Sequence, residues 1–258
     1  MPTKYEIRIP ESVLVGPAHG TQEETNPESA DLFRFSVIRV TFAQLLLTAV
    51  LATLVSLHTS DDEVAFSCAL AASVNFVAAL HYYFIMNARE RTCQSPTQDK
   101  VVHSLRYSDW FVTLPIMTID VMRLASCATN GTEFYINSYW TAALMALVVL
   151  LGANSKLGQF NTRFSEVLFA VSSCCFFVVA YNITLPVAES FPISDSKRSA
   201  DATASLLFTS VWVAYPAYEI VSRSGVVIPY VDDFAFAVLD AVSKVGLALY
   251  VSWRSTWM

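Results

Sequence analysis

Residues 106–120 read RYSDWFVTLPIMTID, which places two carboxylates and a guanidinium in an otherwise apolar run. An α-helix rises about 1.5 Å and turns about 100° per residue, so Asp109, Thr113 and Asp120 share one face, with the carboxylates about 16 Å apart along the axis. A charged side chain in the middle of a membrane costs at least about 2.5 kcal/mol on insertion scales. Such a ladder of proton-exchanging groups therefore predicts movement of ions or protons across a membrane.

The chain as a whole has the composition of a membrane protein. Of the 258 residues, 54% are hydrophobic and 15% are charged, and the mean hydropathy is positive. These values are outside the range of a soluble domain. The net charge of -6 argues against a nucleic-acid partner. The five cysteines show no metal-ligand spacing, so we expect neither a metal site nor a disulfide framework.

Seven apolar stretches follow a polar start, and each is close to the roughly 20 residues that a membrane-spanning helix needs. The sequence therefore predicts an all-α protein, a seven-transmembrane-helix bundle over residues 32–254, in the plasma membrane or an internal membrane. Residues 1–31 carry turn formers and acidic residues without an apolar period, which predicts a polar N-terminal tail, and 255–258 form the C-terminal end. The predicted spans are 33–58, 63–87, 103–127, 134–154, 164–187, 202–223 and 228–253.

The last span carries a lysine in its middle. Lys244 follows Asp240 by about one helical turn and lies on the same face. One interpretation is a structural ion pair that bridges helices. The other includes Arg106 and Asp109 of the third span, which would complete a balanced buried charge cluster. A desolvated lysine is also the usual amine for a Schiff base with an aldehyde.

Three motifs together resemble those of the microbial (type I) rhodopsins, the seven-helix retinal proteins. They fall in the right spans and in the right order, so the resemblance covers roughly residues 33–254. The third-helix, sixth-helix and seventh-helix motifs are Arg106-Tyr107-x-Asp109-Trp110-x-x-Thr113-x-Pro115, Trp212-x-x-Tyr215-Pro216 and Asp240-x-x-x-Lys244.

The resemblance implies a role for each matching residue. Lys244 would bind all-trans retinal as a protonated Schiff base, with Asp109 and Asp240 as counterions. Asp109 would be the primary proton acceptor and Asp120 the cytoplasmic proton donor. The other implied roles are a hydroxyl beside the acceptor for Thr113, a gate toward the release side for Arg106, and walls of the retinal pocket for Trp110, Trp212, Tyr215, Met117 and Pro216.

The residues themselves support one acceptor and one donor. Asp109 lies near the predicted charge cluster and should stay ionised in the dark, whereas Asp120 has apolar neighbours and desolvation should keep it protonated. In the family, Asp, Thr and Asp at these third-helix positions are typical of outward proton pumps. We therefore predict a light-driven outward proton pump, not an enzyme, that works without ATP or metal. Met117 matches a position that separates green from blue absorption in proteorhodopsins, where methionine accompanies green. The dipole of Ser243, next to the lysine, would shift the absorption the other way, and we predict green absorption.

Some positions keep two interpretations. His81 is either a core histidine satisfied by a neighbour or, since His81-Tyr82 resembles the proteorhodopsin and xanthorhodopsin branch, a hydrogen-bond partner of Asp109. Glu219 either meets the retinal pocket or faces the release side beside Arg106 or Arg223. Asp232 and Asp233 lie near the position of a proton-releasing glutamate in bacteriorhodopsin, but a helix N-terminus also favours acids.

Two other functions share the same chromophore. A photosensor often lacks the donor carboxylate, which this chain keeps as Asp120. A light-gated cation channel usually has further carboxylates in spans one to three, and spans one and two have almost none between Arg39 and His81. The expected partners are the lipid bilayer and protons, with a homo-oligomer, a trimer or pentamer, implied by the resemblance.

The distribution of basic residues conflicts with the orientation that the family implies. The positive-inside rule would place the N-terminus in the cytoplasm, whereas the family has an extracellular N-terminus. The side of the N-terminus carries Arg89, Arg91, Lys100, Lys156, Arg163 and Arg223, and the other side carries mainly Arg123, Lys197, Arg198 and Arg254.

Overall fold

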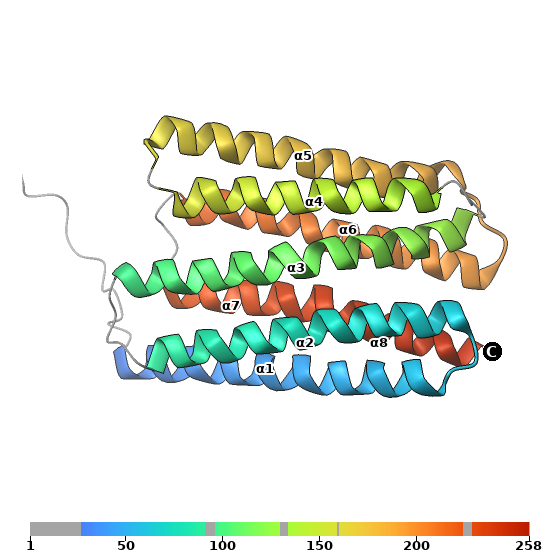
Figure 1. Cartoon of the computed structure of the whole chain (residues 1–258), viewed down its shortest axis with the longest axis horizontal. Helices are drawn as coiled ribbons and strands as arrows, with labels where there is room; N and C mark the ends of the chain where they lie inside the picture. Colours follow the sequence, from blue (N-terminus) through green and yellow to red (C-terminus); the bar gives the residue numbers. More distant parts are fainter. Residues whose placement is uncertain (1–26, 91–95, 130–133, 159, 224–228, 258) are drawn as a thin grey trace, which may run out of the picture.

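The computed structural model describes residues 27–90, 96–129, 134–158, 160–223 and 229–257. Within them, seven helical segments are long and apolar enough to cross a membrane, which confirms the predicted seven-helix bundle. The helices are α1 (Pro27–His58), α2 (Asp62–Glu90), α3 (Pro96–Thr129), α4 (Phe134–Leu157), α5 (Thr162–Glu189), α6 (Ser196–Arg223), α7 (Pro229–Asp240) and α8 (Gly246–Arg254). Consecutive spans run antiparallel in Figure 1, where α7 and α8 together form the seventh span.

Three of the helices, α2, α5 and α6, begin at polar capping residues. Asp61 accepts hydrogen bonds from the backbone of Glu63 and Val64 at the start of α2, at 2.9 and 3.0 Å. Asn161 caps α5 and Asp195 caps α6 in the same way. A side chain that satisfies these otherwise unpaired N–H groups stabilises a helix by about 1 kcal/mol. The cap residues therefore account for where α2, α5 and α6 begin.

Several helices extend beyond the predicted spans. Helix α1 begins at Pro27, α3 at Pro96 and α6 at Ser196, each about six residues earlier than predicted. The hydropathy pattern marks only the apolar part of a helix, and these first turns are polar. Residues 1–26, which include most of the predicted tail, lie outside the described residues.

The seventh span is interrupted by a π-helical segment, Ala241–Val245, between α7 and α8. Lys244 lies within it. A π-helical turn widens the helix by one residue and is found mostly at functional sites. Because such a turn has no simple residue signature, the sequence analysis treated this span as one regular helix.

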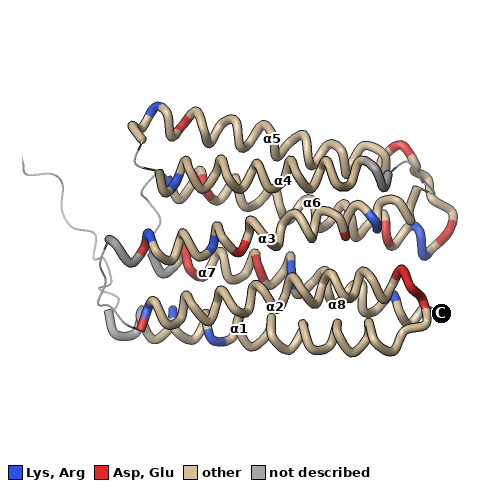
Figure 2. The backbone as a smooth tube through the Cα atoms, viewed as in Figure 1, with Lys and Arg blue, Asp and Glu red and all other residues tan. Residues whose placement is uncertain are grey.

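The two ends of the bundle differ in the chain segments that they bring together. We call the end where α1, α3, α5 and α7 begin the N-terminal end, and the opposite end the C-terminal end (Figure 1). The bundle surface carries large apolar side chains, among them Leu47, Phe76 and Phe177, as a helix facing lipid requires. Charged positions lie mostly toward the two ends, with a few near the middle of α3 and α7 (Figure 2).

Candidate functional site

Lys244 lies in the centre of the bundle between two carboxylates. Its side chain is fully buried, and its Nζ donates a hydrogen bond to Oδ2 of Asp109 on α3. The Nζ also lies 3.2 Å from Oδ1 of Asp240, the last residue of α7. The structure therefore brings together the three charged residues that the sequence analysis placed at the centre of the site. One cation and two anions leave this group with one net negative charge when all three are ionised.

Asp240 is fixed by three donors from three helices. The Tyr82 and Tyr215 hydroxyls each donate to it at 2.9 Å, and the Trp110 indole N–H lies 3.4 Å from Oδ1. The Tyr215 hydroxyl also lies 3.2 Å from Oγ of Ser243. A carboxylate with this many donors has little freedom to rotate.

Asp109 is held less tightly than Asp240. Its Oδ1 is buried and has no hydrogen-bond partner among the described residues. The Thr113 hydroxyl, predicted to lie beside the acceptor, donates at 2.9 Å to the backbone carbonyl of Asp109 and not to its carboxylate. One oxygen of Asp109 is therefore available to take a proton.

The sequence analysis missed Asn75 of α2. Its amide donates to the backbone carbonyl of Lys244 at 3.1 Å and to that of Ala71 at 2.9 Å. This contact satisfies a carbonyl in the π-helical segment. An asparagine inside an apolar span was the available signal, because a polar amide in the membrane needs partners.

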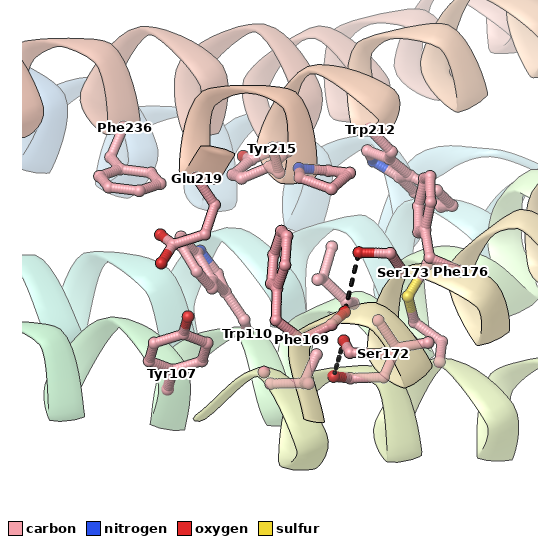
Figure 3. A pocket seen from close by; sticks show the side chains of 16 residues that line it. Tyr107, Trp110, Phe169, Ser172, Ser173, Phe176, Trp212, Tyr215, Glu219 and Phe236 are labelled. Atoms are coloured by element: carbon pink, nitrogen blue, oxygen red, sulfur yellow. Dashed lines mark hydrogen bonds between the residues drawn. The ribbon is translucent and has the colours of Figure 1, made fainter. Parts of the chain in front are cut away.

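An aromatic cavity that is partly open to the surroundings adjoins this charged group. Four of the predicted pocket residues line it, and Figure 3 shows its side chains. Met117, also predicted for the pocket, is buried in the core cluster that contains Trp212. Pockets with such an apolar and aromatic lining suit organic cofactors. The four predicted residues in the wall are Trp110, Trp212, Tyr215 and Pro216.

Of the two interpretations of His81, the hydrogen bond in the structure matches the histidine that is satisfied by a neighbour. Its Nδ1 lies 2.9 Å from the backbone carbonyl of Val77, one turn earlier in α2. No hydrogen bond joins it to Asp109 within the described residues, although the two are close enough to interact electrostatically. The neighbouring Tyr82 is the residue of this pair that reaches a carboxylate, and that carboxylate is Asp240.

Arg106 belongs to a second charged group, which corrects the predicted four-residue cluster. Its guanidinium binds Asp232 at 3.0 Å, donates to Asp233, and lies 4.7 Å from the ring centre of Phe236. Asp109 is only three residues away in sequence. A long side chain can point either way along its helix, and here two aspartates at the N-terminal end hold it.

Asp233 binds two further arginines that the sequence analysis did not assign. Arg34 of α1 lies 2.9 Å from it and Arg89 of α2 lies 3.1 Å from it. Arg89 also pairs with Asp99 at 2.7 Å. We call Arg34, Arg89, Arg106, Asp232 and Asp233 the arginine cluster. It joins α1, α2, α3 and α7 at the N-terminal end, and the only sequence signal was that Arg34 stands at the edge of an apolar span.

Glu219 combines the two alternatives of the sequence analysis. It lies beside Arg223, at 3.0 Å, and it also lines the aromatic cavity. Lys156 of α4 contacts the same oxygen at 3.0 Å. A carboxylate thus lies in the cavity wall together with two cations.

Asp120 lies in a buried site toward the C-terminal end, beside Ser67 and within electrostatic reach of Arg123 and Arg254. It is 1% exposed, and neither oxygen has a hydrogen bond of normal geometry among the described residues. Farther along, a buried Asp201 accepts from Tyr250 at 2.7 Å and pairs with Arg254 at 3.0 Å. Arg254 therefore pairs with Asp201 and also lies within electrostatic reach of Asp120.

Comparison with known proteins places this site in a family context. The sequence model of a family described as bacteriorhodopsin-like protein matches residues 35–257. Archaerhodopsin-2 of Halobacterium sp. (strain aus-2) is 33% identical over 149 residues, which are 56% of this chain and 54% of that protein. The match thus spans about half the length of this relative.

Two solved structures share the fold. The structure of xanthorhodopsin, a light-driven ion pump with dual chromophore, has a TM-score of 0.76 at 18% identity and covers 89% of this chain and 94% of its own. A light-driven proton pump from Leptosphaeria maculans has a TM-score of 0.71 at 16% identity, with coverages of 88% and 97%. At these identities the likeness shows the fold alone.

Proposed function

Since this chain belongs to the bacteriorhodopsin-like family of microbial rhodopsins, we propose that it is a light-driven proton pump that moves protons outward. Microbial rhodopsins bind retinal. The observation that carries the proposal is the contact of Lys244 with Asp109 and Asp240 beside an aromatic cavity. A pump needs an amine that holds the chromophore, an acceptor on one side and a donor on the other, and this chain has a candidate for each.

The residues around Lys244 fit retinal. Trp110 and Tyr215 line the cavity and also donate to Asp240, so the cavity lies next to the carboxylate that contacts Lys244. Its walls are mostly apolar and aromatic, as a polyene requires. All-trans retinal, joined covalently to the Lys244 Nζ with loss of water, would supply light absorption and the isomerisation that starts proton transfer.

The two carboxylates next to Lys244 would have different roles. Asp109 has a free oxygen and accepts the proton that leaves the Lys244 Nζ. Asp240 is held by three donors and stays as a fixed negative charge. A pair of acids in different environments is the usual way to separate these roles.

The direction of transfer follows from the positions along α3. Asp109 is nearer the N-terminal end than Asp120, which is eleven residues farther along the helix. A proton taken by Asp109 leaves toward the arginine cluster, and Asp120 returns one from the C-terminal end. Transport is outward if the N-terminal end faces outside.

The basic residues that oppose this orientation have another explanation. Arg89, Lys156 and Arg223 raise the count on the N-terminal side, yet each forms an ion pair with a carboxylate inside the bundle. Their positions serve these ion pairs. The excess of Lys and Arg is therefore weak evidence for a cytoplasmic N-terminus.

Illumination of cells that express the protein with retinal tests the proposal. We expect acidification of the medium that an uncoupler abolishes, and no pigment with Lys244→Ala. Pigment formation by Lys244→Ala would contradict the retinal site. A photocurrent that reverses with the cation gradient under voltage clamp would instead identify a channel, and a pigment that moves no protons would indicate a photosensor.

A further inference from the structure

Glu219 occupies an unusual place for a carboxylate. It is 7% exposed and lines the aromatic cavity one helical turn after Tyr215 on the same face of α6. Figure 3 shows it extending beside Trp110 toward Tyr107. A buried charge in an apolar cavity needs compensating interactions, because removing it from water costs several kcal/mol.

Two cations share this carboxylate. The Lys156 Nζ and the Arg223 Nε both lie 3.0 Å from Oε1 of Glu219. Arg223 is itself fixed, because it donates to Oγ of Ser155 at 2.6 Å and lies 4.4 Å from the ring centre of Phe169. We call Glu219, Lys156 and Arg223 the glutamate triad. Its charge is +1 when all three are ionised.

The glutamate triad lies away from Lys244. Lys244 is on the seventh span, and the cavity begins at the residues that bind its partner Asp240. The opposite walls come from α4 and α5, and their part nearest the triad includes Gly152, one turn before Lys156, and Phe169. Lys156 belongs to α4, and Arg223 packs on Phe169 of α5. A long ligand that starts at Lys244 would therefore end near the triad.

We propose that the glutamate triad sets the wavelength that the protein absorbs, with Glu219 shifting it to the red and its two cations shifting it to the blue. This inference rests on the proposed function. Light absorption by a cationic polyene moves positive charge from the nitrogen toward the far end. A negative charge at that end lowers the excitation energy and a positive charge raises it, by Coulomb's law.

The alternative is that the triad only holds α4 to α6. In that case, its variants would change stability and leave the colour unchanged. The two possibilities separate because removal of the anion and removal of a cation have opposite effects on an excitation energy, whereas either removal weakens a structural ion pair.

The experiment compares absorption maxima of purified pigments. Glu219→Gln should move the maximum to shorter wavelength and Lys156→Met to longer wavelength, each by on the order of 10 nm, for a unit charge several ångströms from the polyene at an effective dielectric of about 20. Glu219→Asp keeps the charge and should stay near wild type. Glu166→Gln on α5 is the matched control, because this acid is exposed and is not in the cavity wall.

Shifts of the same sign for Glu219→Gln and Lys156→Met, or no shift in either, would overturn the inference. If Glu219→Gln does not fold, the test uses Lys156→Met and Arg223→Gln, and a red shift is expected for each of them. A wild-type protein that forms no pigment would contradict the proposed function, which is a distinct outcome. Thermal unfolding of each variant, recorded in parallel, identifies effects on stability.

Discussion

The Tyr82 hydroxyl of α2 donates a 2.9 Å hydrogen bond to Oδ2 of Asp240, the residue that precedes the π-helical segment. This bond occupies one oxygen of Asp240, and the other oxygen contacts Lys244 and Tyr215. It thereby connects α2 directly to the charged centre of the site. The pair of residues lies 158 positions apart in sequence.

Removal of the Tyr82 hydroxyl should lower the free energy of unfolding and leave the fold unchanged. Tyr82→Phe leaves Oδ2 of Asp240 buried without this donor, and a hydrogen bond to a charged group is worth about 1.5–3 kcal/mol. We expect a lower midpoint of thermal unfolding in detergent. Tyr83→Phe is the control because its ring is exposed on the same helix. Equal midpoints for the two variants would contradict the role of the bond.

Loss of the Lys244 charge should lower the free energy of unfolding, because its two partners, Asp109 and Asp240, would then repel each other. Lys244→Met leaves Asp109 and Asp240 buried without their cation, and breaking a buried ion pair typically costs about 3–5 kcal/mol. The double variant Lys244→Met/Asp109→Asn removes one of the two charges and should recover part of the loss. Thermal unfolding of the protein without retinal measures both. A double variant that is no more stable than the single would show that repulsion is not the cause.

Loss of Asp120 should slow the second half of the photocycle. With Asp120→Asn, the proton returned to Lys244 has to come from bulk water, so recovery should slow by about tenfold for each unit that the pH rises. In the proposed mechanism, wild type already stores this proton on Asp120, so the dependence should be weaker. Flash photolysis over a pH series measures this. Glu63→Gln, an exposed acid near the same end, should behave as wild type.

The spans and the central charges were predictable because both follow from the cost of placing polar groups in a membrane. Twenty apolar residues identify a span, and a lone lysine among them requires acids nearby. Lys244, Asp109 and Asp240 meet this requirement, and the structure places them in contact. The resemblance to a known family added the aromatic walls.

The partners of flexible side chains were not predictable in the same way. Arg106 can reach toward Asp109 or away from it, and only the tertiary structure shows Asp232 and Asp233 beside it. The π-helical segment around Lys244 was missed for a related reason. It is stabilised by contacts with other helices, such as the Asn75 amide on the Lys244 carbonyl, and these depend on packing.

The two acids of the arginine cluster, Asp232 and Asp233, differ in their ion pairs and in their burial. Asp233 binds Arg34, Arg89 and Arg106, whereas Asp232 binds only Arg106 among these three. Asp233 is also the more buried of the two, with its side chain 1% exposed against 13% for Asp232. Asp233 therefore has the structural role, and Asp232 is the better candidate to exchange a proton with solvent at the N-terminal end.

This difference predicts opposite phenotypes for two neighbouring variants. Asp233→Asn removes the buried charge that Arg34, Arg89 and Arg106 share, so it should cost about 3–5 kcal/mol of stability. Asp232→Asn leaves Arg106 paired with Asp233, so it should cost about 1 kcal/mol and instead delay proton release. Thermal unfolding measures the first effect, and a pH-sensitive dye after a flash measures the second. If Asp232→Asn is the less stable variant, or if Asp233→Asn alone delays release, this division of roles is wrong.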